Sequence, residues 1–411
     1  MKTTVSLILS MNLLAGCLAT PHLLADVEPE FNANGITIDA SFPGGNIALT
    51  ETNGEDTFGM APDQRSSNIP WFYWAFRVQG AAGKTLTFKF EPRHVGVAGP
   101  GVSLDGGLSW KWLGDKAVEN GAFKYTFPEG VGEVRFSVGM PYQQSDLNRF
   151  LEKHKGNSLL QVGTLTTTIK GREVPLLKIG QPGKRARWAV NINARHHSCE
   201  MMASYAVEGM IKTVLADNET GKWLRENVDF FIVPFVDFDG VEDGDQGKNR
   251  APHDHNRDYG DSPIYPEVSA IKEQLPVWSD NRPLVAMDIH DPALRSEIHE
   301  TIHFLAPKEE GMAARLAAFT SILGRESQGL ILINQPFVMK FGTFYNKLDS
   351  TPPTNFAGWV RTLPNTYLGY TLEIPYANAS DSEVNAESAR ELGADLAYAL
   401  KVWLEQQPQQ F

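Results

Sequence analysis

The hydrophobic pattern of this chain changes once, near Pro141 and Tyr142, and that change limits the folds available to it. Before it, short runs alternate polar and apolar residues, as in residues 84–90, and turn-forming stretches such as residues 105–107 separate them. A period of two is typical of half-buried strands. Many short strands between turns predict that residues 27–140 form an all-β domain folded as a β-sandwich.

After the change, longer apolar runs alternate with segments of helical spacing. Nearly continuous apolar runs, typical of strands covered on both faces, occupy residues 188–194, 230–236 and 283–289. Residues 200–216 and 382–404 carry apolar side chains at helical spacing. Strands alternating with helices predict an α/β fold, so residues 141–408 should form an α/β/α domain around a mixed, mostly parallel sheet.

The first residues have the pattern of an export signal. A charged start at Lys2 precedes an apolar stretch, residues 5–14, and small residues follow. The signal peptide should cover residues 1–25, with the protein exported to the periplasm or cell envelope. Residues 14–17 match a bacterial lipobox and predict a lipid-anchored lipoprotein attached to the membrane through Cys17; the alternative is ordinary cleavage near Ala25, which discards that cysteine.

Composition excludes several classes of protein. Hydrophobic residues make up 42% of the chain and charged residues 21%, which is ordinary for a globular protein. The formal net charge is -12 and basic residues form no block, so we expect no nucleic-acid partner. Two cysteines provide no disulfide framework, so a core must supply stability.

Residues that can bind a metal ion stand after or at the ends of the expected strands, far apart in the sequence. His197 and Glu200 stand three positions apart, as neighbours on a helical turn do. His290 ends another apolar run and can complete a set of three ligands, which leaves the open position of a catalytic zinc. Glu373, inside an apolar run, is then available as general base; its alternative role is a buried salt bridge.

A polar loop between these segments offers further chemistry. Asp254 is placed to orient a zinc-bound imidazole, and the Asn256–Arg257 pair suits a free α-carboxylate. Arg250 is placed to stabilise the oxyanion formed when water attacks a carbonyl. Taken alone, the loop could equally be a solvated surface segment.

The order of these motifs resembles the zinc carboxypeptidases of the carboxypeptidase A type, most closely their cytosolic-carboxypeptidase-like branch. The resemblance rests on residues 195–200 (RHHSCE), 224–241 and the Asp254–Arg257 segment, and residues 71–73 and 103–107 resemble the β-sandwich that precedes the catalytic domain in that branch. Residues 198–199 depart from its usual Pro-Gly, and residues 236–239 from its Asn-Pro-Asp pattern.

This resemblance implies one zinc ion per chain on His197, Glu200 and His290, with Asp254 behind a ligand histidine. It implies Asn256 and Arg257 on the substrate's terminal carboxylate and Glu373 as general base and acid. It implies Arg250 at the scissile carbonyl, with Lys248 as the alternative, because Arg250 matches carboxypeptidase A better than the cytosolic branch. The expected activity is removal of C-terminal residues from peptides that have a free C-terminal carboxylate. The alternatives are an envelope amidase or endopeptidase acting on peptidoglycan stem peptides and a non-catalytic zinc-binding protein.

The sequence leaves the tyrosine that closes over substrate unassigned. The tyrosine that closes over substrate in the family has three candidates, Tyr345, Tyr367 and Tyr370. Cys199 is expected to fill a tight turn, since its neighbours supply no activating cation. The aromatic run at residues 71–78 is expected to be core. The preferred C-terminal residue, the physiological substrate and the oligomeric state are not indicated.

Overall fold

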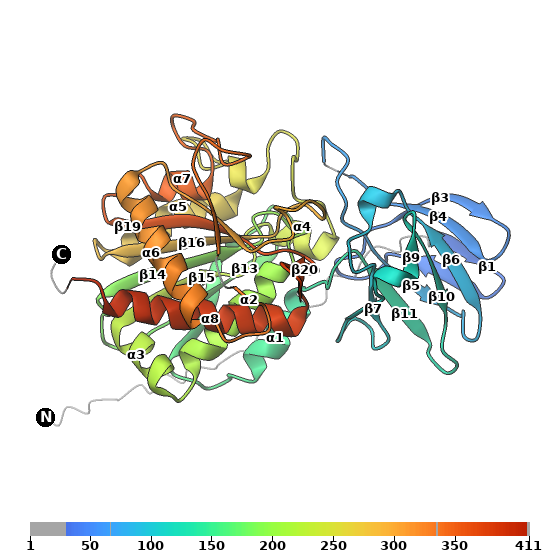
Figure 1. The fold of residues 1–411 in the computed structure, drawn as a ribbon, viewed down its shortest axis with the longest axis horizontal. Coiled ribbons are helices and arrows are strands. Elements are labelled where there is room, and N and C mark those ends of the chain that lie inside the picture. Colours follow the sequence, from blue (N-terminus) through green and yellow to red (C-terminus); the bar gives the residue numbers. More distant parts are fainter. Residues whose placement is uncertain (1–29, 66, 334–335, 409–411) are drawn as a thin grey trace, which may run out of the picture.

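A computed structural model describes residues 30–65, 67–333 and 336–408, and these form two adjacent domains (Figure 1). The predicted signal peptide and Cys17 lie outside the described residues. Within the described residues, no helix has both the length and the apolar character needed to cross a bilayer.

The first domain consists of two antiparallel-rich sheets. The six-stranded sheet has the order β1-β2-β5-β11-β7-β8, with bounds Phe31–Ala33, Ile36–Asp39, Ala75–Gln79, Glu133–Ser137, Gly101–Ser103 and Lys111–Trp112. The five-stranded sheet has the order β3-β4-β6-β10-β9, with bounds Ala48–Asn53, Thr57–Ala61, Thr85–Lys89, Ala122–Thr126 and Val118–Glu119. Phenylalanines at alternate strand positions point inward from both sheets and form the core.

Aromatic contacts join the two sheets directly. The ring centroids of Phe76 on β5 and Phe88 on β6 are 5.1 Å apart, and those of Phe123 on β10 and Phe136 on β11 are 5.5 Å apart. Such pairs add to the area that the rings bury. The fold of residues 31–137 is therefore a β-sandwich, as the alternating pattern predicted.

The second domain contains one eight-stranded mixed sheet. Its order is β12-β13-β15-β14-β16-β19-β17-β18, with bounds Leu160–Thr167, Glu173–Ile179, Val228–Val233, Trp188–Ala194, Leu284–His290, Thr366–Glu373, His303–Leu305 and Phe337–Met339. The four central strands β15, β14, β16 and β19 are parallel to one another. The predicted mixed, mostly parallel sheet is confirmed.

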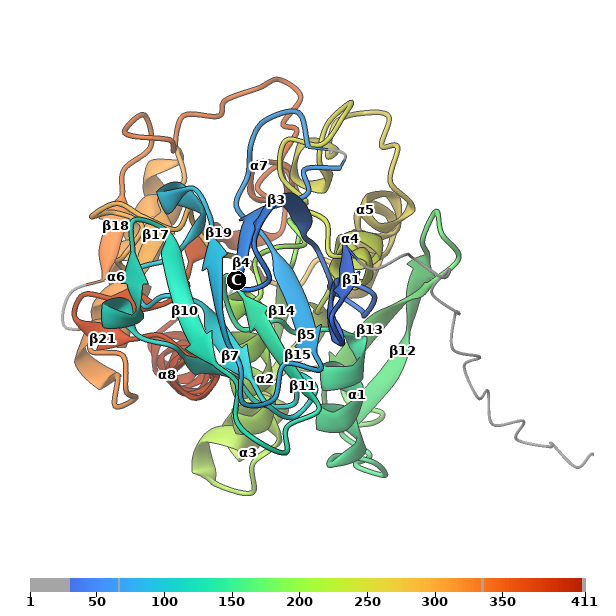
Figure 2. The ribbon, with the colours of Figure 1, turned by 90° about the vertical axis from the view of Figure 1, so that its right-hand side faces the viewer.

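Helices cover both faces of this sheet (Figures 1 and 2). The principal helices are α1 (Gln144–Glu152), α2 (Met202–Leu215), α3 (Glu219–Asn227), α4 (Phe238–Asp243), α5 (Pro266–Ser279), α6 (Glu310–Glu326), α7 (Phe356–Val360) and α8 (Ala386–Glu405). Helices α2 and α8 pack together on one face, and α5 and α7 lie on the other. The last helix begins at Ala386, after a short strand β21 (Ser382–Glu383), because Asn385 caps it by accepting hydrogen bonds from the amides of residues 387 and 388.

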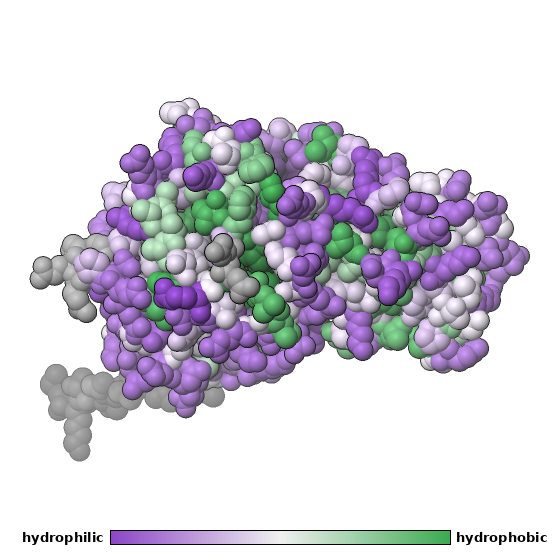
Figure 3. Space-filling model, in the orientation of Figure 1, coloured by the Kyte–Doolittle hydropathy of each residue, from purple (hydrophilic) through white to green (hydrophobic). Residues whose placement is uncertain are grey.

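The outer surface is mainly hydrophilic on the face drawn in Figure 3, with hydrophobic residues gathered over part of the second domain. Exposed apolar side chains of the loop that follows β18 include Phe344 and Leu348.

Parallel strands bring the chemistry to one edge of the sheet. The loop after β14 carries His197, β16 ends at His290, and β19 ends at Glu373. In the register of β16 and β19, His290 stands directly opposite Glu373. Ligand sites of open α/β sheets form at such carboxyl ends.

Candidate active site

Three side chains converge at the carboxyl edge of the sheet. His197 Nδ1 lies 2.8 Å from Glu200 Oε1, and His290 Nδ1 lies 2.6 Å from Glu200 Oε2. Ligand atoms of all three residues lie within 4.8 Å of one another, and all three residues are buried. The two imidazoles that were predicted to meet do meet.

The loop of residues 195–201 positions the first two ligands. Its Glu200 amide donates to the carbonyl of His197 at 3.2 Å, so the pair shares a turn that precedes α2, and not the helical turn that the spacing suggested. Arg195 begins the loop with φ of 62°, and its guanidinium donates to the carbonyls of Tyr142 and Ser198. The buried guanidinium supplies hydrogen bonds to backbone carbonyls that no helix satisfies here, and it thereby fixes the turn.

Carboxylates hold the outer side of each histidine. His197 Nε2 lies 3.7 Å from Asp254 Oδ1, and His290 Nε2 lies 2.9 Å from Asp288 Oδ2. Asp288 also contacts His196 Nδ1 at 2.6 Å, which gives a chain of two imidazoles joined by one carboxylate. This arrangement directs both Nδ1 atoms inward and makes them better ligands.

The same contacts keep the outer carboxylates ionised. Burial opposes ionisation of Asp254, but the contact with His197 and the charge of Arg257 hold its pKa well below the usual range. For Asp288, the two neighbouring imidazoles outweigh burial in the same way and lower its pKa. Each histidine therefore faces a negative charge.

Glu373 is buried beside these ligands, and one of its carboxylate oxygens has no hydrogen-bond partner among the described residues. Its side chain is 8% exposed, and among the described residues its Oε2 has no hydrogen-bond partner and the carboxylate has no ion pair. Burial is the main cause that raises the pKa of Glu373 to about 7, although His290 and Lys248 oppose it. A carboxylate with a pKa near neutrality and a free oxygen suits proton transfer better than the alternative role of a buried salt bridge.

The two cations considered for the oxyanion lie in different places. Lys248 Nζ is 2.6 Å from Glu200 Oε1 and 3.2 Å from the Asp291 carbonyl, so it lies at the ligand cluster. Arg250 instead pairs with Asp237 at 2.5 Å and Asp245 at 3.3 Å, and it does not line the pocket. The structure therefore brings the alternative residue, Lys248, to the site and holds Arg250 outside it, because two carboxylates bind its guanidinium there.

The expected carboxylate-binding pair lies at the pocket wall. Arg257 is exposed, and its Nη1 donates to the carbonyl of Asn256 at 2.7 Å. Asn256 is buried, and its Nδ2 lies 3.1 Å from His290 Nε2 while its Oδ1 accepts from the Phe356 amide at 2.9 Å. Arg257 thus lines the pocket with no ion pair among the described residues, and the Asn256 amide lies against His290 and Asp288.

Only one of the three candidate tyrosines lines the pocket. Tyr345 does so, 43% exposed, with its hydroxyl hydrogen-bonded to His303. Tyr370 is buried between strand and helix, and Tyr367 donates to Gln407 at 2.7 Å on another side of the domain. Cys199 is also buried, and burial raises the pKa of its thiol to about 12, which agrees with a packing role.

The β-sandwich supplies part of the pocket wall. Trp71 lines the pocket, and Lys248 Nζ lies 5.1 Å from its ring centroid. Gln64 fixes the tryptophan, because Gln64 Oε1 accepts from its amide at 2.7 Å and Gln64 Nε2 donates to its carbonyl at 2.9 Å. The aromatic run is core as expected from Phe72 to Phe76, and Trp71 packs partly buried against that core while it also lines the pocket.

Residues 246–249, the loop segment that includes Lys248, are hydrogen-bonded to the sandwich. Gln246 accepts from the Tyr73 amide and donates to the Tyr73 carbonyl, both at 2.8 Å. The amide of Asn68 donates to the carbonyl of Asn249 at 2.9 Å. The loop that carries Lys248 is thus held between the two domains.

The residues around the pocket fit a zinc ion. The pocket has a volume of about 270 Å³ and is lined by His197, His290 and Glu373. Two imidazole nitrogens and a carboxylate are the donor set of catalytic zinc sites, which keep another position open for water or substrate. Glu373, which lines this pocket, has a buried Oε2 with no hydrogen-bond partner among the described residues.

The sequence pattern assigned no place in the active site to His196, Asp288 or Trp71. The Asp288–His290 spacing placed both on one face of a strand and was a signal for their contact. His196 and Trp71 gave no such signal, because their partners lie in distant segments.

Comparison with known proteins shows a similarity to zinc carboxypeptidases. The family model for zinc carboxypeptidases matches residues 147–286. Bovine cytosolic carboxypeptidase 3 is 29% identical over 163 residues, which is 38% of this chain and 16% of the bovine protein. Most of that relative's length therefore has no counterpart here.

Solved structures show the same fold. A metallo-carboxypeptidase from Burkholderia cenocepacia has a TM-score of 0.75 at 21% identity, covering 90% of this chain and 99% of the other. A metallo-carboxypeptidase from Pseudomonas aeruginosa, solved with (2-guanidinoethylmercapto)succinic acid, has a TM-score of 0.70 at 21% identity, covering 90% and 99%. Residues 147–286 thus match the zinc carboxypeptidase family model, in agreement with the resemblance seen in the motifs.

Proposed function

We propose that this protein is a zinc metallocarboxypeptidase that removes residues from the C-terminus of peptides. The observation that carries the proposal is the meeting of His197, Glu200 and His290 beside Glu373, although these residues come from three separate segments. One zinc ion held by the three ligands would polarise the scissile carbonyl and the attacking water.

The remaining steps belong to side chains of this chain. Glu373 accepts a proton at its free oxygen from the attacking water and then donates it to the leaving amine. Lys248 supplies positive charge where the oxyanion develops, the role first assigned to Arg250. Arg257, and Asn256 beside it, bind the terminal carboxylate of the substrate, and Tyr345 closes the open side.

The proposal is tested by zinc content and amino-acid release. Purified protein should contain about one zinc per chain, as the family's three-ligand sites do. It should release the last residue from peptides with a free carboxylate and leave the same peptides with amidated ends intact. Zinc retention without any release would favour the non-catalytic alternative, and cleavage of amidated or cross-linked stem peptides alone would favour the envelope amidase.

We also propose that the protein is exported and anchored through a lipid on Cys17. The support is the apolar stretch of residues 5–14 followed by the lipobox at residues 14–17. Labelling of cells with a radioactive fatty acid should mark the wild-type protein and leave Cys17→Ala unmarked. A wild-type protein that takes up no label would contradict the anchor.

A further inference from the structure

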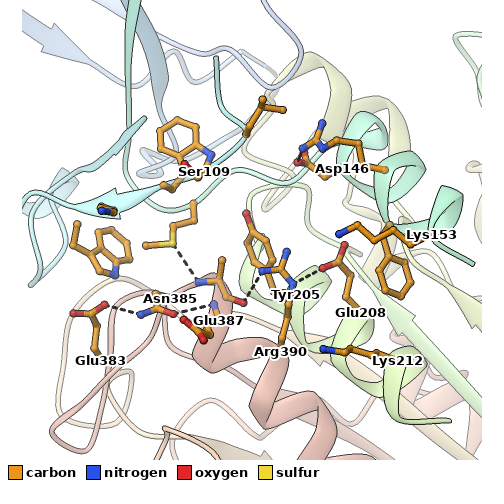
Figure 4. A pocket seen from close by; sticks show the side chains of 18 of the residues that line it. Ser109, Asp146, Lys153, Tyr205, Glu208, Lys212, Glu383, Asn385, Glu387 and Arg390 are labelled. Carbon is orange, nitrogen blue, oxygen red and sulfur yellow. Dashed lines mark hydrogen bonds and ion pairs between the residues drawn. The ribbon is translucent and has the colours of Figure 1, made fainter. Parts of the chain in front are cut away.

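A large cleft lies between the two domains, separate from the catalytic pocket (Figure 4). Its volume is about 940 Å³, and none of its lining residues lines the catalytic pocket. Its walls come from residues 108–112 of the sandwich and from α1, α2 and the start of α8. Space of this size accepts a ligand of several rings.

Two indole rings form fixed apolar surfaces in the cleft. Trp110 Nε1 donates to the carbonyl of Gly107 at 3.2 Å, and Trp112 Nε1 donates to the carbonyl of Val384 at 2.8 Å. Both side chains are only partly buried, so ring surface remains open. Because their polar atoms are already bonded, the rings can offer a ligand only flat stacking surfaces.

Among the side chains that line the cleft, several cations have no carboxylate partner. Arg149 pairs with Asp146, and Arg390 Nε pairs with Glu208 at 2.5 Å. Three exposed lysines also line the cleft, namely Lys111, Lys153 and Lys212. None of them has a carboxylate within ion-pair distance among the residues that the structure describes.

This surplus is local, since the formal net charge of the chain is -12. Lys153 directly follows α1 and Lys212 lies in α2, and both are at the same end of the cleft in Figure 4. Unpaired cations facing one cavity favour an anionic ligand.

Polar acceptors occupy the other end. Glu383, Asn385 and Glu387 lie there in Figure 4, at the entry to α8. Glu383 accepts one hydrogen bond from Asn385 Nδ2 at 2.7 Å, which leaves further acceptor positions on both carboxylates. Such groups suit a ligand that presents several hydroxyl donors.

We propose that this cleft binds an acidic oligosaccharide. The apolar faces of the sugar rings would stack on Trp110 and Trp112, their hydroxyls would donate to Glu383 and Glu387, and their carboxylates would pair with the lysines. A peptide with a carboxylate on every residue would use the lysines but would place other carboxylates against Glu383 and Glu387, whereas a sugar that is acidic on alternate rings can present hydroxyls there. A neutral sugar would leave the cations unused.

Binding is measured on the full-length zinc-loaded protein by calorimetry at low salt. The probes are a hyaluronan hexasaccharide, neutral chitohexaose, and hexaglutamate with an amidated end. Hyaluronan should bind, and the hexapeptide should bind at least about tenfold more weakly, a difference of about 1.4 kcal/mol. Because surface charges are screened, hyaluronan binding should weaken as salt is raised.

Two double variants assign the binding to the cleft. Trp110→Ala with Trp112→Ala, and separately Lys153→Glu with Lys212→Glu, should each weaken hyaluronan binding by about tenfold or more. The matched control Lys184→Glu with Lys222→Glu makes the same charge change on exposed lysines outside the cleft and should bind as wild type. Release of amino acids from a short peptide should be unchanged in every variant, which also reports correct folding.

Three outcomes overturn the proposal. They are absence of hyaluronan binding to the wild-type protein, equal or tighter binding of hexaglutamate, and equal loss of binding in the control variant. None of these outcomes bears on peptide hydrolysis, so the proposed function stands or falls separately.

Discussion

At the scale of single residues, the candidate metal centre is organised by its outer contacts. Asp254 and Asp288 each hold one imidazole by its Nε2 side, which turns the Nδ1 atoms toward Glu200. A carboxylate beside a ligand histidine fixes its tautomer and orientation. Glu373 differs from these carboxylates because burial raises its pKa by more than the nearby positive charges lower it.

Glu373→Gln tests the general base. The variant keeps the shape of the pocket and all three metal ligands, so zinc content should equal that of wild type. Loss of the proton acceptor should reduce kcat by roughly 10²–10⁴-fold. The check is zinc content together with steady-state release of a C-terminal residue, and turnover at the wild-type rate would show that another group is the base.

Lys248→Met and Arg250→Met separate the two cations. Lys248 lies 2.6 Å from a ligand carboxylate, so its removal should lower kcat/KM by roughly 10²–10³-fold. Arg250 pairs with Asp237 and Asp245 outside the pocket, so its removal should act mainly on stability. Kinetics and urea unfolding of both variants decide the assignment; a larger catalytic loss in Arg250→Met would restore the first prediction.

At the scale of elements, the closest packing is between α2 and α8. A Cβ added at Gly393 of α8 would lie 2.0 Å from the carbonyl oxygen of Ala206, and one added at Gly209 of α2 would lie 1.9 Å from that of Arg390. Each helix therefore presents a glycine to the other's backbone. Because α2 begins directly after the loop of residues 195–201, the packing of α2 on α8 also fixes the end of the loop that carries His197 and Glu200.

Gly393→Ala should force these helices apart. The backbone contact leaves no flexible side chain that can yield, so we expect a loss of about 1–3 kcal/mol in the free energy of unfolding. Gly260→Ala is the matched control, since nothing lies within 4 Å of a Cβ there. Urea unfolding of both variants checks this, and equal stability would mean that the helices shift without cost.

At the scale of the whole molecule, the two domains share the catalytic pocket. Trp71 of the sandwich lies beside Lys248, and Gln246 of the loop that carries Lys248 is hydrogen-bonded to the backbone of Tyr73. The sandwich is therefore part of the candidate active site, and a conformational change between the domains would move Lys248.

Removal of zinc should lower the stability of the whole protein. A ligand that binds the folded state alone stabilises it by about 4 kcal/mol when its free concentration is about 1,000 times Kd. Chelated protein should therefore melt at a lower temperature in calorimetry, and added zinc should restore the original Tm. His290→Ala supplies the control, because its Tm should respond little to either treatment.

The sequence by itself determined the two-domain α/β fold and the likeness to zinc carboxypeptidases, and it nominated His197, Glu200, His290 and Glu373. These follow from local periodicity and from positions at strand ends, which parallel strands must bring to one edge. The choice between Lys248 and Arg250, the role of Trp71 and the contact of His196 with Asp288 were decided only by the tertiary structure. The physical reason is that each of these features depends on a partner outside the local segment, as Arg250 depends on Asp237. A local sequence pattern carries no information about which distant side chains will meet.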